Sequence, residues 1–155
     1  MSARSCTRQH SKEVAEELSK LLAESYTLYL KTHNYHWNVT GPMFHSLHLL
    51  FEQQYTELAT AVDSIAERIR ARGREAPGSY AEFARLSSVK DAEGEPDAMT
   101  MLSTLAEDHR TVAERANKVL KLAGQHEDEG SATIASDRIE IHEKAAWMLS
   151  AHLGN

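Results

Sequence analysis

The placement of the helix-breaking residues constrains this chain more than any other feature. The chain has seven glycines and three prolines, and five of these ten residues fall between Gly73 and Pro96. Few breakers remain elsewhere, which leaves long stretches on both sides. Glycine and proline are the residues that a helix interior tolerates least. The rest of the 155 residues therefore has room for long helices. No alternating pattern of apolar and polar residues competes for a strand.

Apolar residues recur three and four positions apart in four stretches, which is the spacing of one helix face. We predict helices over about residues 11–38, 42–72, 97–124 and 131–152. Ser11 is the expected cap of the first helix, and Pro42 suits the first turn of the second. Gly73 follows the end of the second helix, as a C-terminal glycine commonly does.

The connection between the second and third predicted helices, Gly73 to Pro96, is long for a compact domain. It holds a short periodic piece, Tyr80 to Leu86, that predicts a small helix. Four helices with one long crossover are typical of ferritin-like connectivity. We therefore predict an all-α fold, a ferritin-like four-helix bundle whose crossover between helices 2 and 3 carries a short helix. It would form one domain over residues 1–155, with a flexible N-terminal tail at residues 1–10.

Composition bounds the setting in which the chain works. Cys6 is the only cysteine, so no intrachain disulfide can form, which fits a reducing compartment. No apolar run follows the first basic residues, and no apolar stretch approaches the 18 or so residues of a membrane span. We expect a cytoplasmic protein that does not enter membranes. The net charge of −6 argues against a nucleic-acid-binding surface over the whole chain.

Nine histidines are a high count for this length and are the first indication of metal chemistry. His48 and Glu52 lie four residues apart on the second predicted helix, and so do Asp63 and Glu67. Residues four apart share one face of a helix and can reach the same ion. Mixed nitrogen and carboxylate ligands suit iron, manganese or zinc better than calcium.

Helix geometry limits how these two pairs can combine. At about 100° per residue, all four positions fall within an arc of roughly 100°, but Glu52 and Asp63 are separated by roughly 16 Å along the axis. One straight helix cannot place both pairs around one metal. Two copies packed antiparallel about a two-fold axis, crossing near Glu57 and Leu58, would bring them together. Alternatively, each pair completes a site with other helices of its own bundle.

The sequence His36-Trp37-Asn38-Val39, followed by Gly41, His48, a carboxylate at position 52, Asp63 and Glu67, resembles the Dps mini-ferritins. These are the DNA-binding proteins from starved cells and their relatives. The spacing 36-48-52-63-67 matches the ferroxidase ligand pattern of that family. The resemblance continues through the last two helices to Lys144-Ala145-Ala146-Trp147-Met148, so it covers nearly the whole chain.

The resemblance implies a hollow homo-dodecamer with ferroxidase sites at its two-fold interfaces. His36, His48 and Glu52 of one subunit would bind iron together with Asp63 and Glu67 of its mate, with zinc as an alternative occupant of the same site. The family oxidises Fe(II), commonly with hydrogen peroxide and otherwise with oxygen. It stores ferric oxyhydroxide in the cavity, which protects the cell against oxidative damage.

Three features depart from the family pattern. Position 52 is Glu where many members carry Asp. The tail carries only Arg4 and Arg8, with Lys12 just beyond, where DNA-binding members usually have a longer lysine-rich tail. Thr133 stands where relatives place an aspartate of an iron-entry pore. The acidic residues nearby are the expected substitutes: Glu127, Asp128, Glu129 and Asp137.

Two alternative functions remain open. The first is a nucleoid-associated protein whose main role is DNA binding and compaction. Twelve chains of charge −6 carry −72 together, which repels phosphate unless basic tails cluster. The second is a metal-binding cage without oxidase activity, such as a zinc-loaded shell, for which His33 and His45 are further candidate ligands.

Overall fold

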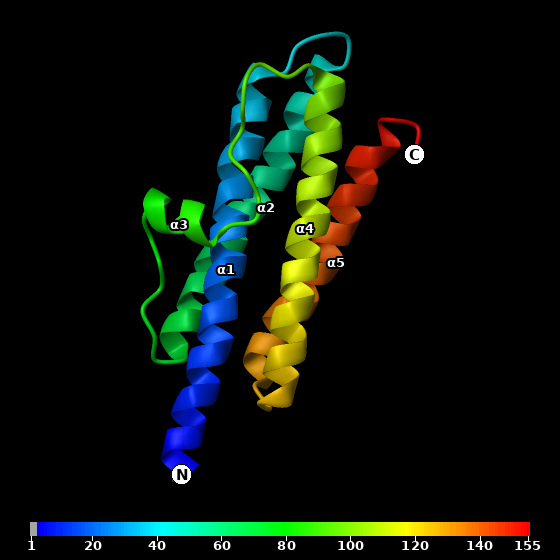
Figure 1. Ribbon diagram of the computed structural model, residues 1–155. Coiled ribbons are helices and arrows are strands. Elements are labelled where there is room, and N and C mark those ends of the chain that lie inside the picture. Colours follow the sequence, from blue (N-terminus) through cyan, green and yellow to red (C-terminus); the bar gives the residue numbers. More distant parts are fainter. Residues whose placement is uncertain (1–2) are drawn as a thin grey trace.

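The computed structural model describes residues 3–155 and shows an all-helical chain with five α-helices in that range. They are α1 (Ala3–Asn38), α2 (Phe44–Ala71), α3 (Tyr80–Leu86), α4 (Ala98–Gln125) and α5 (Glu129–Ala151). Figure 1 shows α1 and α2 as one antiparallel pair and α4 and α5 as a second. None of the helices in residues 3–155 is both long and apolar enough to cross a membrane.

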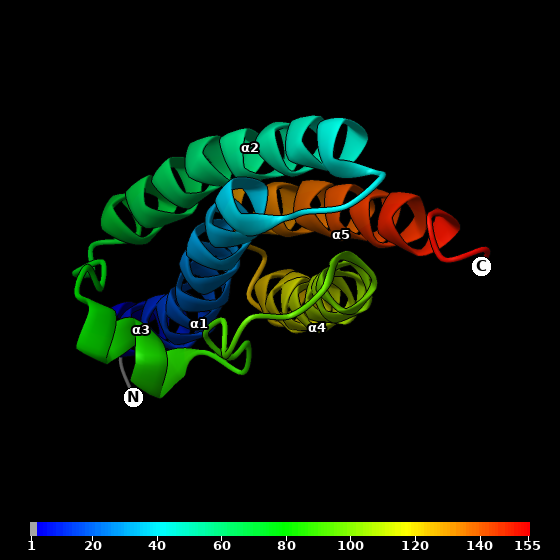
Figure 2. The same cartoon turned by 90° about the horizontal axis from the view of Figure 1, so that it is seen from above.

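The four long helices surround a core of leucine, isoleucine, valine and alanine side chains. Its largest fully buried members are Phe51, Leu18, Leu21, Leu22, Leu28, Leu47, Leu58, Ile65, Ile69, Leu102, Leu105 and Leu149. The chain returns from the end of α2 to the start of α4 along the length of the bundle, and α3 lies on that path. Figure 2 shows α3 outside the bundle, against α1. The predicted bundle with a long crossover carrying a short helix is confirmed.

The first helix begins earlier than the sequence predicts. It starts at Ala3, so Ser11 is not its cap, and the predicted tail is helical from residue 3 on; Met1 and Ser2 lie outside the described residues. The Ser11 hydroxyl instead donates to the carbonyl of Arg72, 2.9 Å away, and ties α1 to the end of α2. Residues 3–9 are exposed, so they carry no apolar stripe from which a helix could be predicted.

Aspartates cap two of the remaining helices. Asp97 accepts a hydrogen bond from the Thr100 N–H at 2.8 Å, so α4 begins where the sequence predicts. Asp128 accepts from the Ser131 N–H at 3.1 Å, which starts α5 at Glu129, two residues before the predicted Ser131. An aspartate at this position satisfies an N–H group that the helix itself leaves without a partner.

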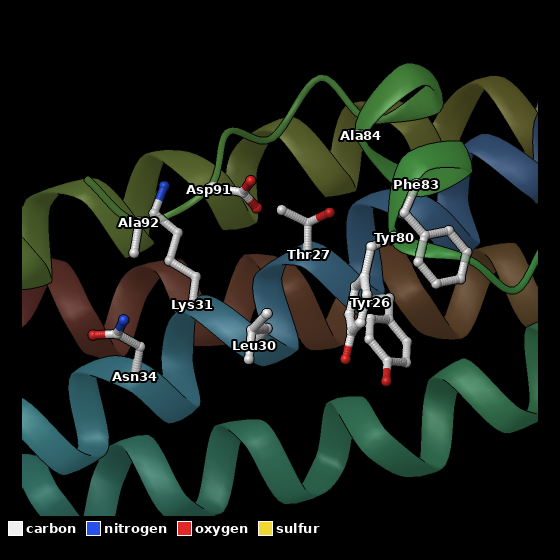
Figure 3. Close-up of a pocket in the computed structure, with 10 residues that line it drawn as sticks. All are labelled: Tyr26, Thr27, Leu30, Lys31, Asn34, Tyr80, Phe83, Ala84, Asp91 and Ala92. Carbon is white, nitrogen blue, oxygen red and sulfur yellow. The ribbon is translucent and has the colours of Figure 1, made fainter.

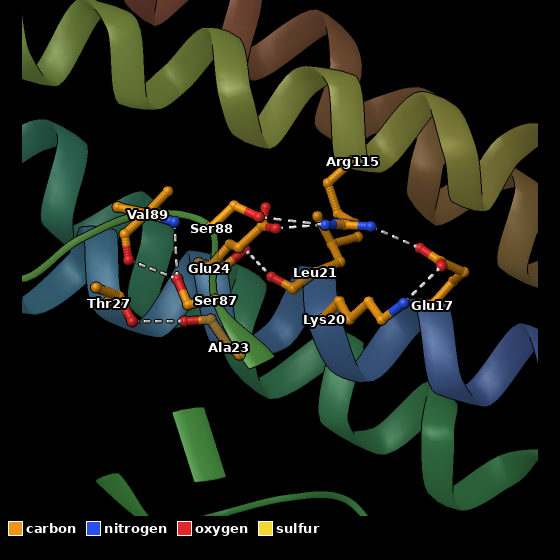
Figure 4. Close-up of polar contacts among 11 residues, drawn as sticks. Glu17, Lys20, Leu21, Ala23, Glu24, Thr27, Ser87, Ser88, Val89 and Arg115 are labelled. Atoms are coloured by element: carbon orange, nitrogen blue, oxygen red, sulfur yellow. Dashed lines mark hydrogen bonds and ion pairs between the residues drawn. The ribbon is translucent and has the colours of Figure 1, made fainter. Parts of the chain in front are cut away.

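Buried ion pairs hold the crossover on the bundle. The Arg115 guanidinium donates to Glu24 at 2.9 Å and to Glu17 at 3.1 Å, and it also reaches Ser88 of the crossover, as Figure 4 shows. Lys31 bridges Asp108 and the carbonyl of Lys90, each 2.9 Å away. Buried charges of this kind are tolerated because each has a partner, and loss of one partner is costly. The crossover is therefore fixed against α1 and α4.

Candidate functional site

Two of the predicted ligands, His36 and His48, meet where α1 ends and α2 begins. Their imidazole rings are stacked with centroids 3.8 Å apart and planes 12° from parallel. His36 is buried and His48 is half-buried. The short turn between the helices, in which Gly41 has a φ of +105°, reverses the chain so that position 48 comes back beside position 36.

Reciprocal hydrogen bonds orient this pair. His36 Nδ1 donates to the His48 carbonyl, and His48 Nδ1 donates to the His36 carbonyl, both at 2.7 Å. Because a carbonyl only accepts, each Nδ1 carries the proton, so each neutral ring keeps its lone pair on Nε2. Histidines that bind metals are commonly oriented in this way, with the other ring nitrogen donating to a carbonyl. The backbone thus orients both rings and leaves two ring nitrogens free to accept a ligand.

The three predicted carboxylates lie on the exposed side of α2. Glu52 follows His48 by one turn, whereas Asp63 and Glu67 lie three to four turns further along the same continuous helix. The separation of roughly 16 Å between Glu52 and Asp63 therefore persists in the folded chain. Within residues 3–155, no three His, Cys, Asp or Glu side chains are placed to hold one ion. A single chain presents His36, His48 and Glu52 as one group and Asp63 and Glu67 as another.

Apolar side chains are exposed on the surface near the histidine group. Four of the large hydrophobic side chains left exposed lie on the second half of α1 and the first half of α2: Leu30, Trp37, Phe44 and Leu49. Between the two groups of ligands, the outward residues of α2 are small, namely Thr56, Ala59 and Thr60. Leu58 lies near the point where two copies of this helix are predicted to cross, but it is 1% exposed and points into the core. A second helix could approach closely along these small residues, and Leu58 would not take part in the contact.

An aromatic cluster supports the histidine pair. His33 stacks on Tyr55, with centroids 4.1 Å apart, and packs against Trp37 at 3.9 Å. Tyr55 in turn meets His36 edge-on at 5.1 Å. Burial lowers the pKa of His33, and electrostatic repulsion by the neighbouring His36 lowers it further. His33 is therefore packed beside the ligand group, whereas His45 lies exposed at the start of α2.

A second histidine pair, which the sequence did not predict, lies inside the bundle. His109 of α4 and His142 of α5 are 2% and 0% exposed, and their Nδ1 atoms are 2.8 Å apart. Arg138 lies 3.0 Å from His142 Nε2 and forms two hydrogen bonds to Glu57, at 2.7 and 2.9 Å. Glu57 comes from α2, so this network links three helices. Its one signal in the sequence is His109, which stands in the apolar stripe of its helix.

Arg138 sets the protonation of this inner pair. Since a guanidinium only donates, His142 Nε2 accepts and His142 Nδ1 carries the proton that it donates to His109 Nδ1. His109 then carries its proton on Nε2, which is buried without a hydrogen-bond partner in the described part of the chain. Burial and the Arg138 charge lower the pKa of His109 to about 3. Burial, with His109 and Arg138, also lowers the pKa of His142 well below 6.5.

One residue of the predicted acidic pore is already engaged. Asp128 is buried and paired with Arg68 at 2.6 Å and Arg72 at 3.2 Å. Gly130 makes room for this contact, since a Cβ there would lie 2.6 Å from the Arg68 guanidinium. Burial raises the pKa of Asp128, but hydrogen bonds from Ser131 and Arg68 outweigh it and hold the pKa below its usual value. Asp128 is thus a capping residue and does not substitute for a pore aspartate.

A hollow of about 370 Å³ lies between α1 and the crossover, and Figure 3 shows its lining. Tyr26, Tyr80 and Phe83 form its apolar end, with Tyr26 and Phe83 stacked at 4.9 Å. The ammonium group of Lys31 also lines the hollow, but it is already paired with Asp108. The hollow contains none of the predicted ligands, so the histidine group at the start of α2 remains the stronger candidate site.

Known proteins resemble this chain over almost its whole length. A family model described as a ferritin-like domain matches residues 15–155. DNA protection during starvation protein 2 of Bacillus anthracis is 36% identical over 92% of this chain and 98% of its own. General stress protein 20U of Bacillus subtilis is 35% identical over 93% of this chain and 99% of its own. A crystal structure of a Dps protein from Vibrio cholerae, described as one of the ferritin-like diiron-carboxylate proteins, has a TM-score of 0.90. It is 32% identical and covers 94% of this chain and 92% of its own.

Proposed function

This chain belongs to the Dps family of ferritin-like proteins, and from that premise we propose that it is a ferroxidase and iron store that protects against oxidative damage. The reciprocal hydrogen bonds between His36 and His48 carry the proposal. They leave two Nε2 lone pairs, and Glu52 follows His48 by one helical turn, so the chain offers a ligand set suited to Fe(II). A stress-protein relative and a diiron-carboxylate relative support the same function.

The site is completed by a second copy of the chain. Asp63 and Glu67 of one subunit would face His36, His48 and Glu52 of its mate across a two-fold axis, which gives two equivalent sites per pair. The exposed apolar side chains around this surface support burial against a partner. Small residues at Thr56 and Ala59 would let the two α2 helices approach closely. Six such pairs would make a closed dodecamer in the cytoplasm.

The reaction consumes iron as its substrate. Two Fe(II) ions give one electron each to hydrogen peroxide, which takes up two protons and leaves as two water molecules, so no hydroxyl radical forms. His36 and His48 bind Fe(II) through Nε2, and the three carboxylates stabilise the harder Fe(III) product. With oxygen as the oxidant the same ligands act on the same substrate. No observation favours zinc as the occupant.

The test is oxidation of Fe(II) by peroxide in the purified assembly. Iron is added anaerobically, peroxide is injected, and ferric absorbance is followed for the native protein and for the double variant Asp63→Ala, Glu67→Ala. We expect rapid oxidation in the native protein and loss of most of it in the variant. Mixing this variant with His48→Ala subunits should restore part of the rate, since some interfaces then pair two intact half-sites.

The matched control is Glu16→Gln, which removes an exposed carboxylate from α1, far from the site. It should oxidise iron at the native rate. Equal rates in the native protein and the Asp63, Glu67 double variant, with both assemblies intact, would show that these carboxylates are not ligands. Failure of the mixed subunits to recover any rate would place the site within one chain.

A local basic patch supports DNA binding as a second candidate function. The first turns of α1 and the residues after α2 form a shallow groove that contains Arg4, Arg8, Arg72 and Arg74. Arg72 is paired with Asp128, and Arg74 donates to the Arg8 carbonyl at 3.1 Å. Arg4, Arg8 and Arg74 therefore give the groove a positive charge that the net charge of the chain conceals. Phosphate contacts of this kind bind any DNA sequence and weaken with salt.

A gel-shift assay separates this candidate from the first. The native assembly should retard DNA at low salt, and Arg4→Gln, Arg8→Gln should not, whereas Arg85→Gln on α3 should behave as the native protein. Fe(II) oxidation should be equal in all three. Absence of retardation of native protein at low salt would remove DNA binding as a function.

A further inference from the structure

A second hollow, of about 300 Å³, is lined by side chains of α2, α4 and α5. Figure 2 shows α2 and α5 lying beside each other along this face of the bundle. None of the proposed iron ligands lines this hollow, so what it binds does not depend on the iron site. We call it the α2–α5 hollow.

Two polar side chains in its lining are buried yet incompletely bonded. His109 is 2% exposed and Gln54 is 9% exposed. The Nε2 atom of His109 and the Oε1 atom of Gln54 have no hydrogen-bond partner among residues 3–155. A buried polar atom without a partner costs free energy. A bound molecule with matching polar groups would recover that cost.

The hydrogen bonds of the inner histidines determine what these two atoms need. His109 Nδ1 accepts from His142, so His109 carries its proton on Nε2. Burial and the Arg138 charge lower the pKa of His109 to about 3, so the ring is neutral at physiological pH. His109 Nε2 is therefore a neutral donor, whereas the Gln54 oxygen is an acceptor. One group that both accepts and donates would satisfy the pair.

This requirement excludes charged ligand groups. A carboxylate cannot donate to the Gln54 oxygen, and an ammonium cannot accept from His109. The lining also lacks a buried charge that is free to pair with either group. Arg138 is already paired with Glu57 at 2.7 Å, and Lys144 is exposed to solvent. A hydroxyl group is neutral, accepts and donates, and so meets both needs.

The other walls of the hollow are apolar. They come from Leu50 of α2 and from Ile141, Ala145 and Met148 of α5. An apolar body that covers these side chains removes their surface from water, which favours binding. A flat aromatic ring suits this place, because a thioether sulfur such as that of Met148 makes favourable contacts with aromatic rings. The volume is several times the roughly 30 Å³ that one water molecule occupies, so a ring has room.

We infer that the α2–α5 hollow binds a small phenol, which is a neutral molecule with one hydroxyl group on an apolar ring. The hydroxyl accepts a hydrogen bond from His109 Nε2 and donates one to Gln54 Oε1. The ring lies against the apolar walls that α2 and α5 provide. This gives the α2–α5 face a binding role that is separate from iron oxidation.

The test is a titration of the intact, iron-free assembly with para-fluorophenol, followed by fluorine NMR of the ligand. We expect saturable binding of one molecule per chain. The methyl ether para-fluoroanisole can accept from His109 but cannot donate to Gln54, so it should bind about tenfold more weakly. The charged analogue para-fluorobenzoate should show no saturable binding, because neither its charge nor the Gln54 oxygen finds a partner.

Two variants locate the binding. Gln54→Leu removes the acceptor, so it should weaken binding of para-fluorophenol about tenfold and change binding of para-fluoroanisole little. Ala145→Leu places a larger side chain in the hollow and should abolish binding of both probes. Gln125→Leu and Ala151→Leu make the same two changes at exposed positions at the ends of α4 and α5, and should bind as the native protein does.

Three outcomes would overturn the inference. Absence of saturable binding by the native protein would mean that water alone occupies the hollow. Equal affinity for the phenol and its methyl ether would mean that the hydroxyl is not recognised. Undiminished binding by Ala145→Leu, with native helix content and assembly size, would place the probe elsewhere. Asp63→Ala, Glu67→Ala should bind the phenol normally while losing Fe(II) oxidation, so failure of one proposal is distinguishable from failure of the other.

Discussion

The molecule contains two histidine pairs that differ in the hydrogen-bond partners of their ring nitrogens. In the outer pair, His36 and His48, each Nδ1 donates to a backbone carbonyl and both Nε2 lone pairs are left for a ligand. In the inner pair, His109 and His142, the rings bond each other and Arg138 occupies one Nε2. The outer pair therefore keeps two ring nitrogens free to accept a ligand, whereas the inner pair links three helices.

Burial reinforces this contrast. The inner pair is almost completely enclosed, and its pKa values are lowered by burial and by Arg138, so both rings are neutral at physiological pH. A neutral, hydrogen-bonded pair can remain in a core where a charged imidazolium could not. The role of a histidine pair therefore follows from its hydrogen-bond partners and exposure, and the presence of two adjacent rings does not decide it.

The largest expected effect is on catalysis by the outer pair. His48→Ala removes one proposed nitrogen ligand and should lower the rate of Fe(II) oxidation by on the order of 100-fold. The thermal midpoint should change little, because His48 is half-buried and makes one side-chain hydrogen bond. Stopped-flow ferric absorbance and a melting curve on the same sample measure both quantities. A native rate in the intact His48→Ala assembly would mean that the outer pair is not a ligand pair.

The inner pair should show the reverse behaviour. His142→Ala leaves a cavity and removes the partner of both His109 and Arg138, which should cost about 3 kcal/mol of stability. For a subunit of this size that is a fall in the thermal midpoint of roughly 10 °C. Fe(II) oxidation by the assembled variant should stay within about twofold of the native rate. His152→Ala, near the end of the same helix, is the control and should melt close to the native protein.

The outer pair was predicted from the sequence and the inner pair was not, and the positions of their residues explain the difference. His48 was predicted because it stands one turn before Glu52 on the same helix, and His36 was predicted from the resemblance to the Dps family. The inner pair joins positions 109 and 142, and periodicity tells which face His109 occupies but not which polar group of another helix meets it. The same limit applies to Asp128, which looks like a loop acid until Arg68 and Arg72 are seen beside it.

The fold itself was largely predictable, because it depends on features that are local in the sequence. Apolar spacing predicted the four long helices, and the short helix Tyr80–Leu86 was predicted with its observed bounds. The predicted start of α1 was wrong, because residues 3–9 are exposed and have no buried face that would reveal a helix. The ligand roles of Asp63 and Glu67 stay a prediction, because they depend on a second subunit.

The pH dependence of stability should sharpen the contrast further. The folded pKa of His109 is about 3 and that of His142 is also lowered, whereas an unfolded histidine titrates near 6.5. The unfolded chain therefore binds more protons below pH 6.5. The stabilisation is complete above that pH and is lost as pH falls toward 3. Between pH 6.5 and 5 the loss should be roughly 1.5–2 kcal/mol for His109. His142 should add a loss in the same direction.

Comparison of melting curves for native protein and for His109→Gln, His142→Gln at both pH values measures this loss. Glu24 and Asp108, whose pKa values are raised by burial, are present in both proteins, so their opposite contribution cancels in the difference. The double variant should lose much less stability between pH 6.5 and 5 than the native protein. An equal loss of stability between pH 6.5 and 5 in the two proteins would mean that the fold does not hold the inner pair neutral.

The smallest expected effect tests how the inner pair is oriented. Glu57 holds Arg138 with two hydrogen bonds, and Arg138 in turn fixes the His142 tautomer. Glu57→Gln keeps the shape and one acceptor oxygen but removes the charge that balances a buried guanidinium. Because the Glu57 side chain is 38% exposed, solvent screens part of this loss and the expected cost is about 1 kcal/mol.

Since Glu57 lies on α2 between the two groups of proposed iron ligands yet faces inward, the rate of Fe(II) oxidation should not change. A large fall in that rate with a native melting curve would mean that the inner network positions the outer ligands, and the two pairs would then be one coupled system.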